Sequence, residues 1–189
     1  MINVFANYYE ENNPIRKEEI YRCINTNYNF KYINYILINS NDRLKFNYLF
    51  NIINEYTGNQ DINIIANLDI YFDDTILKTK EIKQDQFLCL SRWEVNGANI
   101  RFCNWAYSQD AWVFRGKSKN INGDFFLGWR GCDNRIAYEA KNAGYEVSNP
   151  SLDIKVYHIH NSNVRDYNWS QDEKKVVPPP HLTVEPGHF

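Results

Sequence analysis

The sequence has few cysteines, little net charge and no long apolar run, and each shortage excludes a class of protein. The four cysteines form no CxxC pair and lie too far apart for a zinc knuckle. The 21 basic and 23 acidic residues leave a net charge of −2, which does not fit the basic surface of a nucleic-acid-binding domain. No apolar stretch approaches the roughly 18 residues of a membrane span.

Targeting signals and several enzyme motifs are also missing. The first residues, MINVFANYYEENNP, lack the basic and then apolar segments of a signal peptide, so we expect a cytoplasmic protein with reduced cysteines. There is no Walker loop, GxGxxG, HExxH or GxSxG motif. What remains is 189 residues, 43% hydrophobic and 16% aromatic, enough for one packed core. The 27 asparagines indicate AT-rich coding, so a single asparagine carries little information.

The first half of the chain alternates apolar strands with amphipathic helices. The expected buried strands are residues 2–8, 32–38 and 62–66. Pro14 opens a helix between the first two strands, and a second helix follows that Asp42 caps and Gly58 ends. The apolar positions of this second helix recur every four residues and are Leu44, Tyr48, Ile52 and Tyr56. This order predicts an α/β fold with a mainly parallel sheet flanked by helices.

The second half is less regular. The expected strands are residues 87–95, 111–115 and 154–160, and a helix is expected over 132–143 with Gly144 at its end. From about residue 165 the chain, which contains three consecutive prolines, is expected to run as an extended tail. We find no internal repeat and no composition shift, so residues 1–189 are predicted to form a single domain.

Asn67 and Asp69 follow the third expected strand directly. Because alternate residues of a strand share a face, the two side chains are expected to point the same way, beyond the carboxyl end of the sheet where α/β proteins bind ligands. One carboxylate with water and phosphate oxygens suits a divalent cation bound to a diphosphate. The alternative is a polar strand end that makes local turn bonds.

A second candidate is the segment GWRGCDNR at residues 128–135. Asp133 lies where a helix should begin, so it is either a general base beside a cleft or the cap of that helix. Trp129 is either a core residue or a flat wall for a sugar ring. Cys132 is expected to be a small spacer.

Two further groups are weaker. His158 and His160 share a face of the last expected strand. Two histidines alone do not make a zinc site, but one of them could join Asp69 as a ligand of a cation. The alternative is that one histidine is packed and the other exposed. Asp110 precedes the expected strand 111–115, and Trp112 lies within it. The two side chains could line an acceptor pocket; the alternative is that the tryptophan packs in the core.

Together these segments resemble a small glycosyltransferase of the GT-A fold. A D-x-D-like Asn67-Leu68-Asp69 follows the β-α-β-α-β half, a G-W-x-G-x-D element follows at residues 128–133, and a terminal strand carries the histidines. The G-W-x-G-x-D element is similar to the G-W-G-G-E-D motif of the β-1,4-galactosyltransferase family, with Cys132 in place of its Glu and Asn67 in place of the first Asp of D-x-D. The resemblance covers roughly residues 1–165.

The resemblance implies an inverting transfer of a sugar from a nucleotide-diphosphate sugar, UDP-linked, to a hydroxyl of a glycan acceptor. It makes Asp133 the base and makes Asp69, with His158 or His160, the ligands of Mn²⁺ or Mg²⁺. Tyr8 and Arg43 would lie beside the nucleoside, together with Asn67, Asp69 and Trp129 around the donor, while Asp110 and Trp112 would contact the acceptor. Two other functions stay open: a non-catalytic carbohydrate- or partner-binding module, and a sugar nucleotidyltransferase, although FANYYEENNPIRK lacks the glycine-rich loop that the latter needs.

Overall fold

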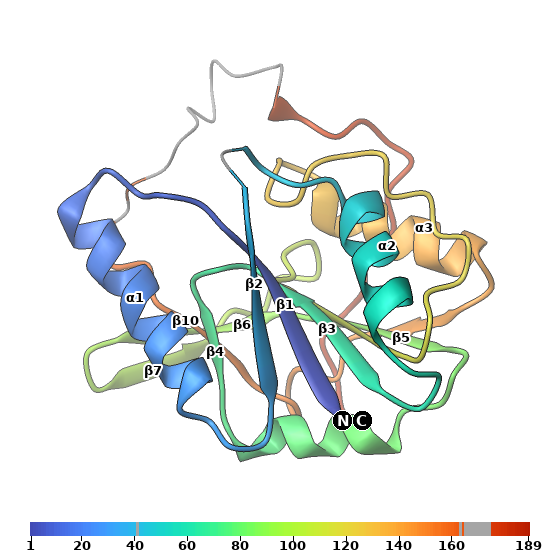
Figure 1. Cartoon of the computed structure of the whole chain (residues 1–189), viewed down its shortest axis with the longest axis horizontal. Coiled ribbons are helices and arrows are strands. Elements are labelled where there is room, and N and C mark those ends of the chain that lie inside the picture. Colours follow the sequence, from blue (N-terminus) through green and yellow to red (C-terminus); the bar gives the residue numbers. More distant parts are fainter. Residues whose placement is uncertain (41, 163, 165–174) are drawn as a thin grey trace.

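The computed structural model describes residues 1–40, 42–162, 164 and 175–189. Its main sheet has six strands in the order β2-β1-β3-β8-β5-β9 (Figure 1). These strands are β1 (Ile2–Tyr8), β2 (Asn34–Asn39), β3 (Ile62–Ala66), β5 (Gln86–Leu90), β8 (Ala111–Arg115) and β9 (Glu146–Ser148). Only β8 runs against the others, because it pairs antiparallel with both β3 and β5. The expected α/β class with a mainly parallel sheet is confirmed.

A smaller sheet lies beside the main one and takes the order β4-β10-β6-β7. Its strands are β4 (Ile70–Phe72), β6 (Arg92–Asn96), β7 (Asn99–Phe102) and β10 (Val156–His158). β10 pairs antiparallel with β4 and parallel with β6. The chain segments after β3 and after β10 therefore meet in space, although almost ninety residues separate them.

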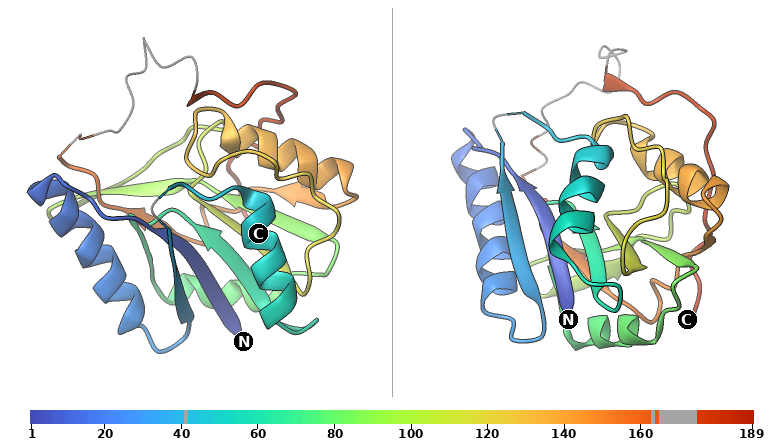
Figure 2. Two further views of the ribbon diagram at one scale, coloured as in Figure 1. Left: turned by 45° about the horizontal axis from the view of Figure 1, so that its top comes forward. Right: turned by 45° about the vertical axis from the view of Figure 1, so that its right-hand side comes forward.

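Helices cover both faces of the main sheet (Figure 2). The helix α1 (Pro14–Tyr28) begins where the side chain of Asn13 accepts two backbone N–H bonds, with proline at the first helical position. It packs on one face, while α2 (Phe46–Tyr56) and α3 (Cys132–Asn142) pack on the other. A 3₁₀ helix, η1 (Asp74–Glu81), follows β4 and is capped by Asp73.

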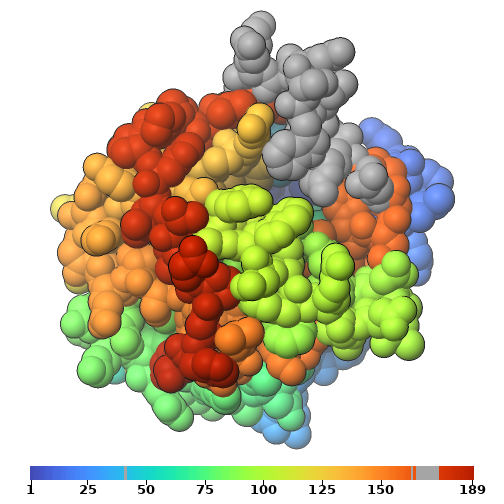
Figure 3. All heavy atoms as spheres, turned by 180° about the vertical axis from the view of Figure 1, so that it is seen from behind, coloured from blue at the N-terminus to red at the C-terminus, as the bar shows by residue number. Residues whose placement is uncertain are grey.

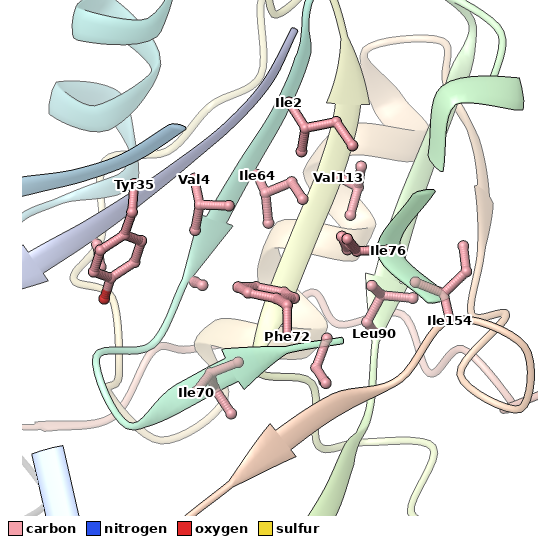
Figure 4. Close-up of a cluster of buried hydrophobic side chains, with 14 of the residues drawn as sticks. Ile2, Val4, Tyr35, Ile64, Ile70, Phe72, Ile76, Leu90, Val113 and Ile154 are labelled. Atoms are coloured by element: carbon pink, nitrogen blue, oxygen red, sulfur yellow. The ribbon is translucent and has the colours of Figure 1, made fainter. Parts of the chain in front are cut away.

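The side chains of β1 point alternately to the two faces of the main sheet and belong to two separate cores. Ile2, Val4 and Ala6 join a cluster with α1, β4 and η1, part of which is drawn in Figure 4. Phe5, between them, points to the opposite face and joins the aromatic cluster under α2 and α3. A sheet that is buried on both faces has mostly apolar strands, which is why β1 and β3 are easily predicted from the sequence, although Asn3 and Asn63 interrupt their apolar residues.

The buried face of α2 differs from the prediction. Tyr48 and Tyr56 are 51% and 74% exposed, and the buried residues are instead Phe46, Leu49, Phe50 and Ile53. These four are more apolar than the row that contains the tyrosines, so burying them removes more apolar surface from water. The cap prediction is also wrong, because Lys45 is the N-cap and makes no side-chain cap bond, so Asp42 lies outside the helix.

Two strand boundaries also differ from the prediction. The expected strand 87–95 is two strands, β5 and β6, which belong to different sheets. The last strand, β10, ends at His158, so His160 lies outside it. Ser91, between β5 and β6, belongs to neither strand, and there the chain passes from the main sheet to the smaller one.

The C-terminal residues 175–189 run along the surface beside the segment before β8 (Figure 3). Backbone hydrogen bonds attach them at several points: Val177 N–H to Arg130 O at 2.8 Å, Leu182 N–H to Asn134 O at 2.9 Å and Val184 N–H to Ala106 O at 3.2 Å. The first ten residues of the expected tail, 165–174, lie outside the described residues. Within the described part of the chain, no helix is both long enough and apolar enough to cross a membrane.

Candidate active site

A cavity of about 530 Å³ opens beyond the carboxyl ends of β1 and β3, the edge where α/β sheets bind ligands. Much of its wall comes from the end of β1, the turn after β3, the loop before β8, the segment around the start of α3 and the end of β10. The cavity-lining residues that the sequence predicted are Arg43, Asn67, Asp69, Asp110, Trp129, Asp133, His158 and His160. Residues from widely separated motifs thus share one cavity.

Asp69, His158 and His160 form a candidate metal site, since one ligand atom from each lies within 4.8 Å of the others. The antiparallel pairing of β10 with β4 places His158 opposite Ile70, next to Asp69. A further backbone bond, from the N–H of Ile159 to the carbonyl of Asp69 at 3.2 Å, fixes the two segments to each other. Sheet pairing therefore brings His158 to Asp69.

The imidazole of His158 is buried between two carboxylates. Its Nδ1 lies 3.0 Å from Oε2 of Glu94 and its Nε2 lies 3.0 Å from Oδ2 of Asp69. Burial alone would lower the pKa of His158, but the charge of Asp69 and the hydrogen bonds to Asp69 and Glu94 raise it to about 9. Conversely, burial alone would raise the pKa of Asp69, and the charges of His158 and Arg16 lower it well below its usual range.

His160 faces the same site from beyond the strand. Its Nε2 lies 2.7 Å from the carbonyl of Val164, and burial together with the charge of Arg16 lowers the pKa of this histidine. Because the carbonyl can only accept, Nε2 carries the proton and Nδ1 keeps its electron pair. A carboxylate oxygen and two imidazole nitrogens are donors that suit Mn²⁺ or a similar divalent ion, so the chemistry of this cluster fits a metal.

Asp133 does not cap α3. The N-cap is Gly131, whose φ of 85° favours glycine, and Asp133 follows in the first turn. Its Oδ2 accepts the backbone N–H of Gln109 at 3.3 Å, and its Oδ1 accepts the thiol of Cys132 at 3.0 Å. Burial and the nearby charge of Asp110 raise the pKa of Asp133 to about 7. A carboxyl group that titrates near neutral pH and lines a cavity has the properties of a general base.

Asn67 and Asp69 both line the cavity, but the strand-face argument for them is wrong. β3 ends at Ala66, and residues 67–69 form a turn into β4. Asn67 donates from Nδ2 to Oδ1 of Asp110 at 2.9 Å, and Oδ2 of Asp110 pairs with Arg92 at 3.1 Å. Asn67 thus orients Asp110, and Asp69 turns toward the histidines.

Two of the predicted site residues lie elsewhere. Trp112 is completely buried, with its ring edge-on to Phe46 at 5.1 Å, because its position on β8 points under α2 rather than toward the cavity. Tyr8 does not line the cavity, and its hydroxyl donates a hydrogen bond to Glu10 at 2.9 Å. Its neighbour Tyr9, just beyond the end of β1, does line the cavity. These two placements correct the expected acceptor and nucleoside contacts.

Several cavity residues were missed from the sequence. Trp105 and Tyr107 are 53% and 58% exposed, with rings stacked at 5.8 Å on the loop before β8. Their spacing of two in W-A-Y was a usable signal. Arg16 and His181 also line the cavity, and nothing in their local sequence distinguishes them from surface residues. Arg92 lines it as well.

Neither a family model nor a curated protein matches this sequence. The similar solved structures include two of Drosophila β1,4-galactosyltransferase 7. A mutant in complex with manganese, UDP-Gal and xylobiose is 14% identical with a TM-score of 0.52, and the catalytic domain in complex with xylobiose is 13% identical with a TM-score of 0.53. Each similarity covers 96% of this chain and 82% of the other. This chain has the GT-A fold. At this identity the similarity establishes the fold alone.

Proposed function

We propose that this protein is a metal-dependent glycosyltransferase that moves a sugar from a nucleotide-diphosphate sugar, UDP-linked, to a hydroxyl group of a glycan acceptor. The observation that carries the proposal is one cavity lined by both a metal-binding cluster and a carboxyl group with a raised pKa. The GT-A fold supports it, and the similar Drosophila enzyme was solved with manganese and UDP-Gal.

In this proposal Asp69, His158 and His160 hold a divalent cation at one side of the cavity. A bound Mn²⁺ or Mg²⁺ stabilises the negative charge of a departing diphosphate. Glu94 fixes the ring of His158 through Nδ1 and leaves Nε2 facing the site. Arg43 packs 5.7 Å from the ring of Tyr9 on another wall, where a flat nucleobase and its ribose would find an aromatic and a cationic contact.

Asp133 serves as the base in the other half of the reaction. It takes the proton of the acceptor hydroxyl as that oxygen bonds to the anomeric carbon, while the bond from the anomeric carbon to the diphosphate oxygen breaks. The diphosphate leaves with the electron pair of that bond. With the base and the cation on opposite sides of the sugar, a single displacement inverts the anomeric centre.

Trp105 and Tyr107 supply aromatic surface for the sugar rings of the acceptor. Trp105 and Tyr107 replace the predicted Trp112 in this role because they are exposed and line the cavity. Trp129 also lines it and packs against Phe126 with ring centroids 4.4 Å apart. Asp110, held by Asn67 and Arg92, also lines the cavity.

The test is turnover of a panel of UDP-linked sugars with β-linked xylose and glucose acceptors, in Mn²⁺ and in excess chelator. We expect Mn²⁺-dependent release of UDP, and NMR of the new linkage should show inversion at the anomeric carbon. Asp133→Asn should lose transfer by roughly 10²–10⁴-fold, the range for a general base, and still bind the donor. Nucleotide binding without turnover of any donor would favour the binding module, and retention of configuration would exclude Asp133 as an inverting base.

A further inference from the structure

Behind the metal cluster, α1 carries a buried acid that does not line the cavity. Glu19 is 8% exposed, and its carboxylate accepts four hydrogen bonds. Its Oε1 accepts the backbone N–H groups of Asn161 and Ser162, both at 2.7 Å. Its Oε2 accepts the hydroxyl of Ser162 at 2.7 Å and Nη1 of Arg16 at 3.0 Å. Three of these four bonds go to the two residues directly after His160.

Arg16, one turn earlier on α1, binds the chain on the other side of His160. Its Nη1 donates to the carbonyl of Ile159 at 2.7 Å, and its Nη2 pairs with Asp69. The Arg16–Glu19 pair therefore holds the peptide groups before and after His160. Both residues are buried.

The two histidines differ in what fixes their backbone. His158 is the last residue of β10 and pairs with Ile70 on one side and Glu94 on the other. His160 lies two residues beyond the end of that strand, outside its ladder of backbone bonds. In the described part of the chain, the peptide groups around His160 bond to Arg16 and Glu19 of α1 and to the carbonyl of Asp69.

We propose that Glu19 is a positioning residue for the metal ligand His160. Its carboxylate accepts hydrogen bonds from the N–H groups of Asn161 and Ser162. These bonds turn the chain so that the imidazole of His160 faces Asp69 and His158. The inference rests on the proposed function only in that the cluster must hold a metal. A carboxylate suits this position because it accepts several hydrogen bonds at once and pairs with Arg16, whereas a neutral side chain of similar size offers fewer acceptor sites.

The first test is the affinity of the protein for Mn²⁺ alone, measured by the EPR signal of free Mn²⁺. Glu19→Ala should weaken binding by about 10–100-fold, the scale for losing a residue that orients a ligand. Glu19→Gln keeps one acceptor oxygen and should weaken binding less. Glu18→Ala is the matched control, because Glu18 is exposed on the same helix and carries the same charge; its affinity should equal that of the wild type.

A double-mutant cycle separates positioning from a loss of negative charge near the cation. If Glu19 acts through His160, Glu19→Ala should cost little further affinity in a protein that already carries His160→Ala. The same substitution should retain its full effect in a protein that carries His158→Ala. A simple charge effect would instead add equally to both histidine variants, and that result would overturn the proposal.

The outcomes also separate this inference from the proposed function. If His160→Ala weakens Mn²⁺ binding and Glu19→Ala does not, the positioning role is wrong and the metal site stands. If the wild type and His160→Ala bind Mn²⁺ equally, His160 is not a ligand and the positioning role falls with it; if the wild type does not bind Mn²⁺ at all, the metal site itself is wrong. Circular dichroism and the melting temperature confirm folding. If Glu19→Ala does not fold, Glu19→Gln replaces it in the double-mutant cycle. A Mn²⁺ affinity of Glu19→Gln equal to that of the wild type would then reject the positioning role of Glu19.

Discussion

Oε2 of Glu94 lies 3.0 Å from Nδ1 of His158, and this contact determines which ring nitrogen faces Asp69. A carboxylate that accepts the Nδ1 proton leaves Nε2 as the nitrogen that can bind a cation, an arrangement common around metal-binding histidines. Glu94 is itself held by Arg92, whose Nε lies 2.6 Å from its other oxygen. The orientation of His158 thus depends on a residue that contributes no ligand atom to the cluster.

Glu94→Ala should weaken Mn²⁺ binding by about 10–100-fold without unfolding the protein. The reason is that the ring of His158 loses the partner that fixes its orientation and its tautomer. The measurement is a Mn²⁺ titration followed by EPR. Glu146→Ala serves as the control, because that acid is exposed on β9, far along the main sheet from the cluster. Equal affinities for all three proteins would show that His158 does not bind through Nε2.

Asp69→Asn should reduce turnover by on the order of 10²-fold or more, since it removes the carboxylate that holds the cation near the leaving diphosphate. It should also lower the melting temperature, because Arg16 is left buried with Glu19 as its remaining acidic partner. Steady-state rates with increasing Mn²⁺, together with thermal unfolding, measure both effects. Full activity of the wild type in excess chelator would contradict the role assigned to Asp69.

Activity should rise with pH through about 7. Burial and Asp110 raise the pKa of Asp133 to that value, and only the ionised carboxylate can accept the proton of the acceptor. A profile of kcat/KM between pH 5.5 and 8.5 tests this, with the pH-independent residual activity of Asp133→Asn as the control. An unchanged pH midpoint in that variant would mean that another group limits the rate.

Asp133→Asn, which should abolish most of the activity, should raise the stability of the protein above neutral pH. A carboxyl group whose pKa is raised by folding binds its proton more tightly in the folded state, so it destabilises the fold progressively as pH rises from about 4 to about 7. Asp133→Asn removes that cost, so its melting temperature should exceed that of the wild type at pH 8. The gain should shrink at pH 5, and each 1 kcal/mol relieved corresponds to about 2–4 °C.

Replacing the exposed and the buried tryptophans should separate binding from stability. Trp105→Ala, alone or with Tyr107→Ala, should raise the KM for the acceptor and leave the melting temperature within a few degrees of the wild type, since both rings are more than half exposed. Trp112→Ala should instead destabilise the protein by about 3–5 kcal/mol, the cost of a large cavity in a core. An unchanged acceptor KM in the double variant would remove these rings from the acceptor site.

Local sequence was sufficient for much of the fold. Mostly apolar segments predict β1 and β3, because both faces of the main sheet are buried, and Pro14 after Asn13 marks the start of α1. It was insufficient where two patterns compete within one segment. In α2 the period of four predicts burial of the row with Tyr48, and the packing of Phe46 against Trp112 of β8 decides that the other row is buried.

For the site, the sequence by itself determined the residue types: an acid after β3, an acid after the glycines at 128 and 131, and two histidines near the end. The tertiary structure decided their relations. Pairing of β10 with β4 places His158 beside Asp69, and the position of Trp112 on β8 buries its ring. Glu19 and Glu94 acquire their partners in the same way. The physical reason is that hydrogen bonding and burial act between atoms in contact, and contacts between distant segments follow from strand pairing, which no local pattern specifies.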